Sequence, residues 1–163
     1  MPRAKTGFVR FFESLELVKI ALVETSAWRS QDFALPAKVT LKHELSVEAA
    51  GPRRYAAVCK YDLTAVVKAG DDPGLLVSIT YSVLYSAVGE LDSQAQKLLT
   101  DNALGATWPY MRCYVRSITS EMGLAPLVIG LFKVKFQPPV SQESKEQTEP
   151  VKATARTRAP KKK

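Results

Sequence analysis

The chain has 163 residues, of which 46% are hydrophobic, and it carries a net charge of +7 at pH 7. This length and composition suit one folded domain with a single hydrophobic core. Two cysteines and one histidine are too few for a disulfide framework or a zinc cluster, which favours a reducing, cytoplasmic setting. No apolar run approaches the roughly 18 residues that span a bilayer, so we expect neither a signal peptide nor membrane insertion.

The positive charge is concentrated at the C-terminal end. Residues 137–163 carry seven basic and three acidic side chains, and from Val151 onward there is no acidic residue. Such a proline-rich segment without aromatic residues cannot bury enough apolar surface to offset its ordering entropy. We therefore predict an N-terminal arm at 1–12, a folded domain at 13–136 and a disordered basic tail at 137–163.

Alternating apolar and polar residues predict four strands. The first covers 15–24, and three more at 38–49, 55–68 and 75–88 are joined by short turns, which is typical of an antiparallel meander. His43 falls in phase with the apolar positions of its strand. It has no partner at metal-ligand or catalytic spacing, so we expect a buried structural imidazole.

A connection of about a dozen residues, 24–36, separates the first strand from the meander and is too long for a tight hairpin. It is rich in apolar side chains, which are normally placed where something covers them. They could plug the end of the sheet as core residues or contact a bound polypeptide. The candidate substrate-binding residues of this crossover are Ala27, Trp28, Phe33 and Leu35.

Two helices are expected after the sheet, one from Asp92 to Leu104 with Asp92 as its N-cap and one that begins near Trp108. Pro109 suits a first helical turn and Gly123 a C-terminal cap. The spacing of the second helix gives an apolar seam that packs within the subunit or between subunits. The seam, taken as a candidate oligomer interface, consists of Trp108, Met111, Val115, Ile118 and Met122.

After Pro126 the chain alternates again and reads as an extended strand. Its apolar side chains Leu127, Val128 and Phe132 complete the candidate substrate-binding set. The predicted fold class is α+β, a four-stranded antiparallel sheet with a crossover loop, followed by helices that pack on the sheet or at an oligomer interface.

Residues 107–127, TWPYMRCYVRSITSEMGLAPL, resemble the helix signature of the SecB family, with a Pro-Tyr-x-Arg step at Pro109, Tyr110 and Arg112, an Ile-Thr-Ser helix end and a Leu-Ala-Pro exit. Residues 31–45 resemble the family's aromatic crossover and second strand, and the likeness spans roughly 13–128. The basic tail differs from the acidic tails of the family's export members. The extended segment after Pro126 stands where the family has a final helix.

The resemblance implies a homotetramer, a dimer of dimers, that binds unfolded or precursor polypeptides in apolar surface grooves. Such proteins hand clients to an export motor or, in a second branch, protect antitoxins. Glycine-rich phosphate loops, nucleophile elbows and paired metal-ligand spacings were not found, and Cys59 and Cys113 lie in apolar contexts typical of inert thiols. We therefore expect a non-enzymatic, ATP-independent holdase without a cofactor, metal or catalytic residue. The alternatives are an adaptor for one partner, such as an antitoxin, and a nucleic-acid-binding module that acts through the tail.

Overall fold

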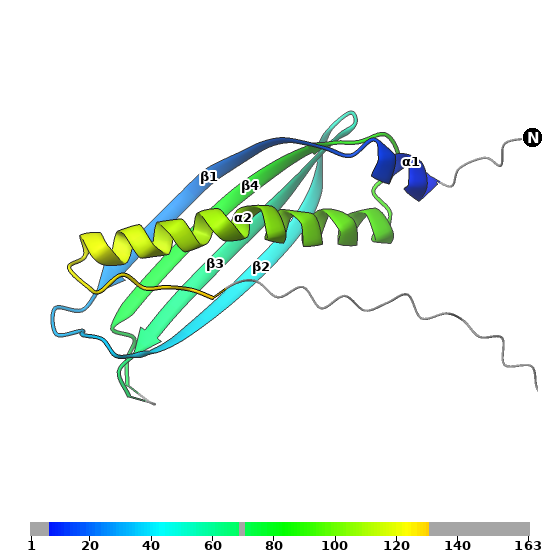
Figure 1. Cartoon of the computed structure of the whole chain (residues 1–163). Helices are drawn as coiled ribbons and strands as arrows, with labels where there is room; N and C mark the ends of the chain where they lie inside the picture. The colour runs from blue at the N-terminus through cyan, green and yellow to red at the C-terminus, as the bar shows by residue number, and fades with distance from the viewer. Residues whose placement is uncertain (1–6, 69–70, 131–163) are drawn as a thin grey trace, which may run out of the picture. The chain divides into compact units, whose positions relative to one another are not determined.

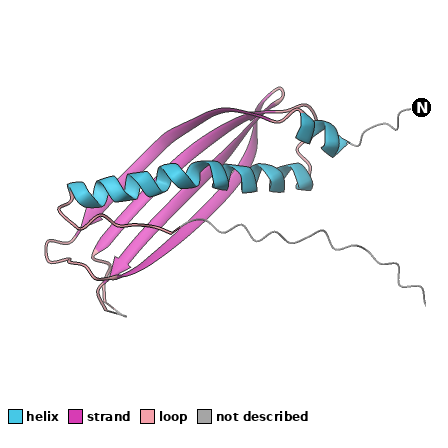
Figure 2. Cartoon of the chain, viewed as in Figure 1, coloured by secondary structure: helices cyan, strands magenta, loops and turns pink. Residues whose placement is uncertain are grey.

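Four antiparallel strands form one sheet in the order β1-β4-β3-β2, and a long helix lies across one of its faces (Figures 1 and 2). The computed structural model describes residues 7–68 and 71–130, all within one compact unit, Met1–Phe132. Phe132 and the predicted tail lie outside the described residues. The elements are α1 (Gly7–Glu13), β1 (Glu16–Arg29), β2 (Lys38–Gly51), β3 (Arg54–Val66), β4 (Leu75–Ser86) and α2 (Ser93–Glu121). The predicted fold class is confirmed.

The two central strands, β3 and β4, show the alternation that the sequence predicts. Every second residue is buried beneath α2, from Tyr55 to Ala65 in β3 and from Leu75 to Tyr85 in β4. Residues that face each other across the two strands, such as Tyr61 and Ile79, have their side chains on the same face of the sheet. These two strands therefore supply most of the sheet's share of the core.

The edge strands β1 and β2 are less buried than the alternation suggests. In β2, Leu41 and Leu45 are half-buried on the core side, opposite Leu63 and Cys59 of β3. His43 is exposed, so the prediction that its imidazole is buried is wrong. The reason is geometric, since β2 is an edge strand and has a neighbouring strand on one side only.

β1 is longer than predicted and continues to Arg29, where it still pairs with Leu75. The predicted loop at 24–36 therefore shrinks to residues 30–37, which cross the end of the sheet to the opposite edge. The register of β1 against β4 shifts between Leu17 and Lys19 and again between Leu22 and Glu24. These two β-bulges leave Val18 and Val23 without a partner in β4, and both side chains are exposed.

The C-terminal half of the domain contains one 29-residue helix, α2, in place of the two predicted helices. Asp92 is its N-cap, as predicted, and its carboxylate accepts a hydrogen bond from Ala95 N. Pro109 lies inside the helix and not in a first turn, which corrects the prediction. The Gly105 carbonyl that loses its hydrogen bond at Pro109 belongs to an exposed residue, where water can replace the missing N–H.

α2 ends in a Schellman motif at Gly123, whose φ of 74° is left-handed. Gly123 N–H donates to the Ser120 carbonyl and Leu124 N–H to the Thr119 carbonyl, so the last carbonyls of the helix are satisfied. The turn sends the following residues back along α2. The sequence assignment of Gly123 as the C-terminal cap region is confirmed.

The buried residues of α2 other than Leu104 recur every four positions, so the buried stripe winds slowly around the helix as it crosses the sheet. Thr107 lies within the stripe, and its hydroxyl satisfies both the Ala103 carbonyl, at 2.8 Å, and the Tyr61 hydroxyl of β3, at 2.6 Å. The buried polar atoms at this helix–sheet contact are therefore paired. The stripe consists of Ala95, Leu99, Ala103, Thr107, Met111, Val115 and Thr119.

Part of the predicted N-terminal arm is helical. Phe11 of α1 is fully buried, and its ring centroid lies 5.3 Å from that of Tyr55 in β3. Tyr55 in turn donates a hydrogen bond to the Gly89 carbonyl. The end of the sheet nearest α1 is closed by these contacts.

Candidate functional site

An apolar groove lies between α2 and the edge strand β1 and has a volume of about 410 Å³. Ile20 and Leu22 form its β1 side because their partners in the ladder, Val83 and Tyr81, have side chains on the face that α2 covers. We call this surface the β1 groove. It is lined by Ile20, Leu22, Tyr81, Tyr110, Cys113, Tyr114 and Ser117.

The side chains of the β1 groove are accessible to a ligand. Leu22 is 50% exposed and Tyr110 is 55% exposed, whereas Tyr81 is buried and forms the floor. The rings of Tyr81 and Tyr110 are tilted against each other with their centroids 6.4 Å apart. Burial raises the pKa of Tyr81 to about 12, so its hydroxyl is neutral at physiological pH. The groove offers apolar and hydroxyl surface without a charged group.

The outer edge of β1 adjoins this groove. In the described part of the chain β1 pairs only with β4, so the other side of its backbone has no strand partner. Five large apolar side chains of the strand are half exposed or more, namely Leu17, Val18, Leu22, Val23 and Trp28. An exposed edge of this kind can accept an additional strand, and the groove beside it can accept that strand's side chains.

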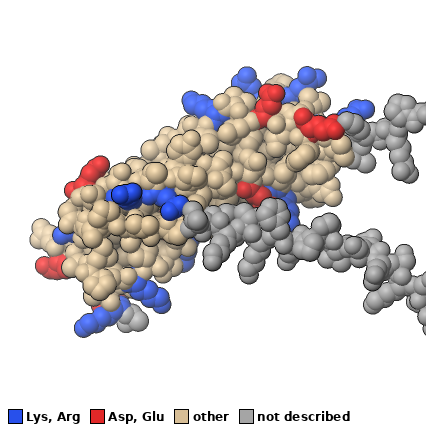
Figure 3. Space-filling model, in the orientation of Figure 1, with Lys and Arg blue, Asp and Glu red and all other residues tan. Residues whose placement is uncertain are grey.

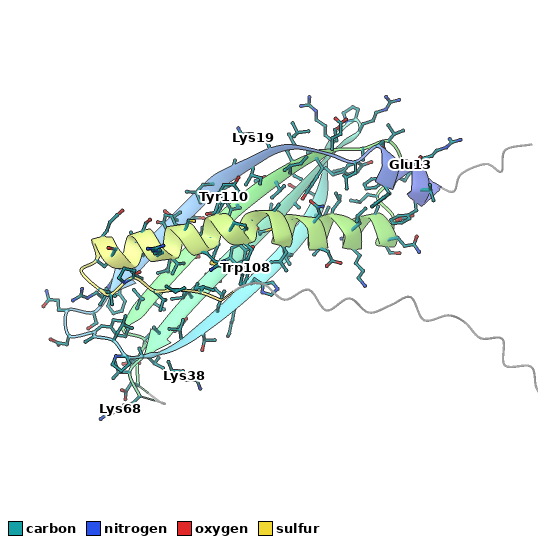
Figure 4. The ribbon with its side chains drawn as sticks, viewed as in Figure 1. Glu13, Lys19, Lys38, Lys68, Trp108 and Tyr110 are labelled. Carbon is teal, nitrogen blue, oxygen red and sulfur yellow. The ribbon has the colours of Figure 1, made fainter. Side chains whose placement is uncertain are left out.

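A second groove, of about 220 Å³, lies on the other side of α2. One wall is the segment 124–130, which we call the strap. Arg112 Nε donates to the Ile129 carbonyl at 2.7 Å, and Trp108 Nε1 donates to the Gly130 carbonyl at 3.2 Å. Figure 4 shows Trp108 and Tyr110 on opposite sides of α2. This strap groove is lined by Pro109, Arg112, Cys113, Arg116, Leu127, Val128 and Ile129.

The predicted substrate-binding residues of the crossover are not brought together. Ala27 pairs with Val77 on the face covered by α2, whereas Trp28 pairs with Leu76 on the opposite, uncovered face and is 52% exposed. Phe33 is 4% exposed and belongs to the core, so its assignment as a client contact is corrected to a packing residue. Leu35 is half-buried and also packs against the core.

The other predicted site residues divide in a similar way. Leu127 and Val128 do lie in the strap groove, and Phe132 is outside the described residues. Met111 and Val115 have no exposed surface in the single chain, so they cannot form an interface with another copy and are corrected to core residues. The remaining members of the predicted interface, Trp108, Ile118 and Met122, are half-buried and pack against the same core.

The residues that form the β1 groove were missed because no single segment carries them. Ile20 and Tyr81 each fit the alternation of their own strand, and only the pairing of β1 with β4 places them side by side. Tyr110 and Tyr114 are four residues apart on α2, off the predicted seam. This pair of tyrosines on one helix face was the signal available in the sequence.

Uncharged residues form most of the face that carries α2, and the charged side chains of both signs that this view shows are scattered (Figure 3). Within residues 7–68 and 71–130, no group of His, Cys, Asp or Glu could hold a metal ion. Among the helices of the same ranges, none is long and apolar enough to cross a membrane.

Comparison with known proteins adds a structural likeness. No protein-family model and no curated protein matches the sequence. The SecB-like chaperone Rv1957 of Mycobacterium tuberculosis, solved in complex with a ChAD peptide from the Rv1956 HigA1 antitoxin, has a TM-score of 0.68 and 18% identity, over 78% of this chain and 97% of that one. A Streptococcus agalactiae protein of unknown function has a TM-score of 0.42 and 9% identity, over 72% and 97%. The first likeness shows that the chain has a SecB-like fold.

Proposed function

We propose that this protein is a non-enzymatic, ATP-independent chaperone that binds non-native polypeptides in the cytoplasm. The observation that carries the proposal is the β1 groove, an exposed apolar surface beside a strand edge that has no partner among the described residues. The chain has the fold of a SecB-like chaperone that was solved with a bound peptide, which supports a polypeptide as the ligand. A binding role requires no cofactor or metal, and we propose none.

In the proposed mechanism, an unfolded client segment lies along β1 in extended form. Its backbone pairs with the free edge, which requires no particular sequence, and alternate side chains enter the groove beside Leu22 and Tyr110. One such contact is weak because ordering the client costs entropy. We propose a homo-oligomer, a tetramer arranged as a dimer of dimers, in which several sites hold one client and later contacts become intramolecular.

A dedicated adaptor is the second candidate function. The complex of Rv1957 with an antitoxin peptide favours it, because there a SecB-like chaperone holds a segment of one specific protein. A general holdase and an adaptor share the same surface and differ in the range of clients. Delivery of precursors to an export motor is a finer form of the same proposal.

Aggregation of a diluted, chemically denatured protein, followed by light scattering without nucleotide, tests the proposal. We expect the wild type to suppress aggregation of several unrelated clients at equimolar protomer. Suppression of none of them, together with no binding to a permanently unfolded protein such as reduced carboxymethylated α-lactalbumin, contradicts a general holdase. Binding to a single protein in a pull-down supports the adaptor.

The site is tested with Leu22→Asp and Tyr110→Ala, which change exposed residues of the β1 groove. We expect each to weaken client binding by about tenfold, which corresponds to ~1.4 kcal/mol. Trp28→Ala is the matched control, since it removes an equally exposed aromatic side chain from the opposite face. A larger loss in Trp28→Ala moves the site to the uncovered face. A changed oligomer mass with unchanged client affinity makes the groove a contact between copies.

A further inference from the structure

We infer that the strap, residues 124–130, occupies a second binding site for extended apolar polypeptide, and that a client gains this site by displacing the strap. The inference rests on the proposed function. Three features carry it, namely the conformation of the strap, the atoms that hold it and the ease with which it can leave.

The strap has the conformation of a bound peptide. It runs back along α2 after the turn at Gly123, without helical or strand hydrogen bonding of its own (Figure 1). Leu127 and Ile129 are half-buried against the core, whereas Val128 between them is 75% exposed. This alternation is that of an extended chain with one side inward, the form that a client segment adopts on a chaperone surface.

Side chains of α2 hold the strap through the strap's backbone groups. Trp108 and Arg112, one helical turn apart, donate side-chain hydrogen bonds to the carbonyls of Gly130 and Ile129. A third contact is the Leu127 N–H, which donates to the Thr119 hydroxyl at 3.0 Å. Every polypeptide carries these amide groups, so the same donors and acceptor fit an extended chain of another sequence.

The strap can leave without unfolding the domain. In the described residues, the last backbone–backbone hydrogen bond toward it is that of Leu124 N–H at the helix cap. Beyond that residue it is held by side chains of α2 and by two half-buried apolar residues. Segments with few buried contacts and no backbone ladder open at a small fraction of the global unfolding free energy. The sheet and α2 keep their own hydrogen bonds when the strap leaves.

The charge of the strap groove limits which client segments fit there. Arg112 and Arg116 line it, and its described lining contains no carboxylate. A client segment with lysine or arginine at this point meets like charge, whereas apolar residues flanked by neutral or acidic ones do not. The site therefore fits extended segments that combine alternate aliphatic residues with a neutral or negative charge.

Competition with the strap lowers apparent client affinity. A site open for a fraction of the time binds with an affinity reduced by that fraction. Loosening the strap should therefore tighten client binding, and fixing it should block the site. A purely structural strap has neither effect, because the client then binds elsewhere.

The test measures how tightly the full chain binds a fluorescein-labelled peptide with the strap's own sequence, LAPLVIG. Binding is detected by fluorescence anisotropy. Leu127→Ser combined with Ile129→Ser releases the strap, and Val67→Ser is the matched control, because Val67 is an exposed valine that lines neither groove. We expect the double variant to bind the peptide about tenfold more tightly and the control to behave as wild type. Circular dichroism and the Tm establish that both variants are folded.

A reversible cross-link that fixes the strap in place provides the opposite test. Val128→Cys places a thiol in the groove that Cys113 also lines, and Cys59 is buried and protected from reagent. A reducible bismaleimide should join the two accessible thiols and abolish peptide binding, and reduction should restore it. Equal peptide affinity in the locked, released and wild-type proteins overturns the inference. If these proteins still suppress aggregation, the proposed function stands; if none of them does, the proposed function fails as well.

Discussion

The ring of Phe33 lies directly against the backbone of Gly74. A Cβ on Gly74 would stand 2.1 Å from Cδ2 of that ring, well inside van der Waals contact. Gly74 also accepts a hydrogen bond from Ser30 N–H and donates one to the Ala65 carbonyl, each at 2.9 Å. The crossover between β1 and β2 is thus fixed to the β3–β4 connection by a contact that only glycine permits.

Gly74→Ala should therefore destabilise the protein by about 1–3 kcal/mol, the usual cost of overpacking a core. Gly105→Ala is the matched control, because the same methyl group meets nothing within 4 Å inside α2. It should stabilise the protein by ~0.5–1 kcal/mol through helix propensity. Urea unfolding of both variants measures the two signs, and a neutral Gly74→Ala contradicts the packing.

Phe33 and Trp28 should contribute very differently to the free energy of unfolding. Phe33→Ala removes a buried ring and should cost about 3–5 kcal/mol of unfolding free energy. Trp28→Ala changes a side chain that is half exposed, so the loss should stay below ~1 kcal/mol. Thermal unfolding decides between them. Equal losses for the two variants would mean that Trp28 is covered in solution.

Stability should fall in alkali. Burial raises the pKa values of Tyr61 and Tyr81 to about 12 from 10.0, and raises that of Tyr85 further. The folded state therefore keeps these hydroxyls protonated after the unfolded chain has lost its protons. The tyrosine contribution is complete below pH 10 and is lost as the pH rises toward 12. Urea midpoints measured from pH 9 to 12 test this.

Tyr61→Phe is the control for that measurement. It removes one titrating hydroxyl and the 2.6 Å hydrogen bond to Thr107. We expect a loss of about 1 kcal/mol at neutral pH, together with a shallower decline above pH 10. An unchanged alkaline slope would show that Tyr61 does not contribute to it.

The basic C-terminal residues should act separately from the grooves. Deletion of residues 140–163 removes seven of the chain's basic side chains and should leave folding and client binding nearly unchanged. Any nucleic-acid binding should disappear with the deletion and should weaken steeply with salt in the full chain. Client binding by apolar surface should survive added salt. Tight nucleic-acid binding by the truncated protein would favour the nucleic-acid-binding module instead.

The sequence predicted the elements whose signal is local. The alternation in β3 and β4 was sufficient because both strands are flanked on both sides, so inward residues such as Tyr61 are fully buried. Pro109 was misread because proline normally begins a helix, and only the exposed position of Gly105 shows why this helix continues. His43 was misplaced because alternation gives the face of a strand but does not show that the strand lies at the edge of the sheet.

The candidate site was less predictable for a related reason. Phe33 and Trp28 are both aromatic residues of one short stretch, and their separation into core and surface depends on Gly74 and on the pairing of β1 with β4. The hydrogen bond from Arg112 to the Ile129 carbonyl depends on the turn at Gly123. Contacts of this kind join segments that are distant in the chain, and periodicity within a segment does not contain them.

The two bulges of β1 bear on the protein's own solubility. A long, apolar strand edge is a template on which copies can stack into insoluble fibrils. Extra residues at Val18 and Val23 divide the regular ladder into short runs, the longest of which covers 24–29. An incoming strand meets a break in twist at each bulge, so pairing cannot propagate along the full edge. The edge of β1 can thus stay available for pairing with a short segment, while the bulges oppose polymerisation of copies through the same edge.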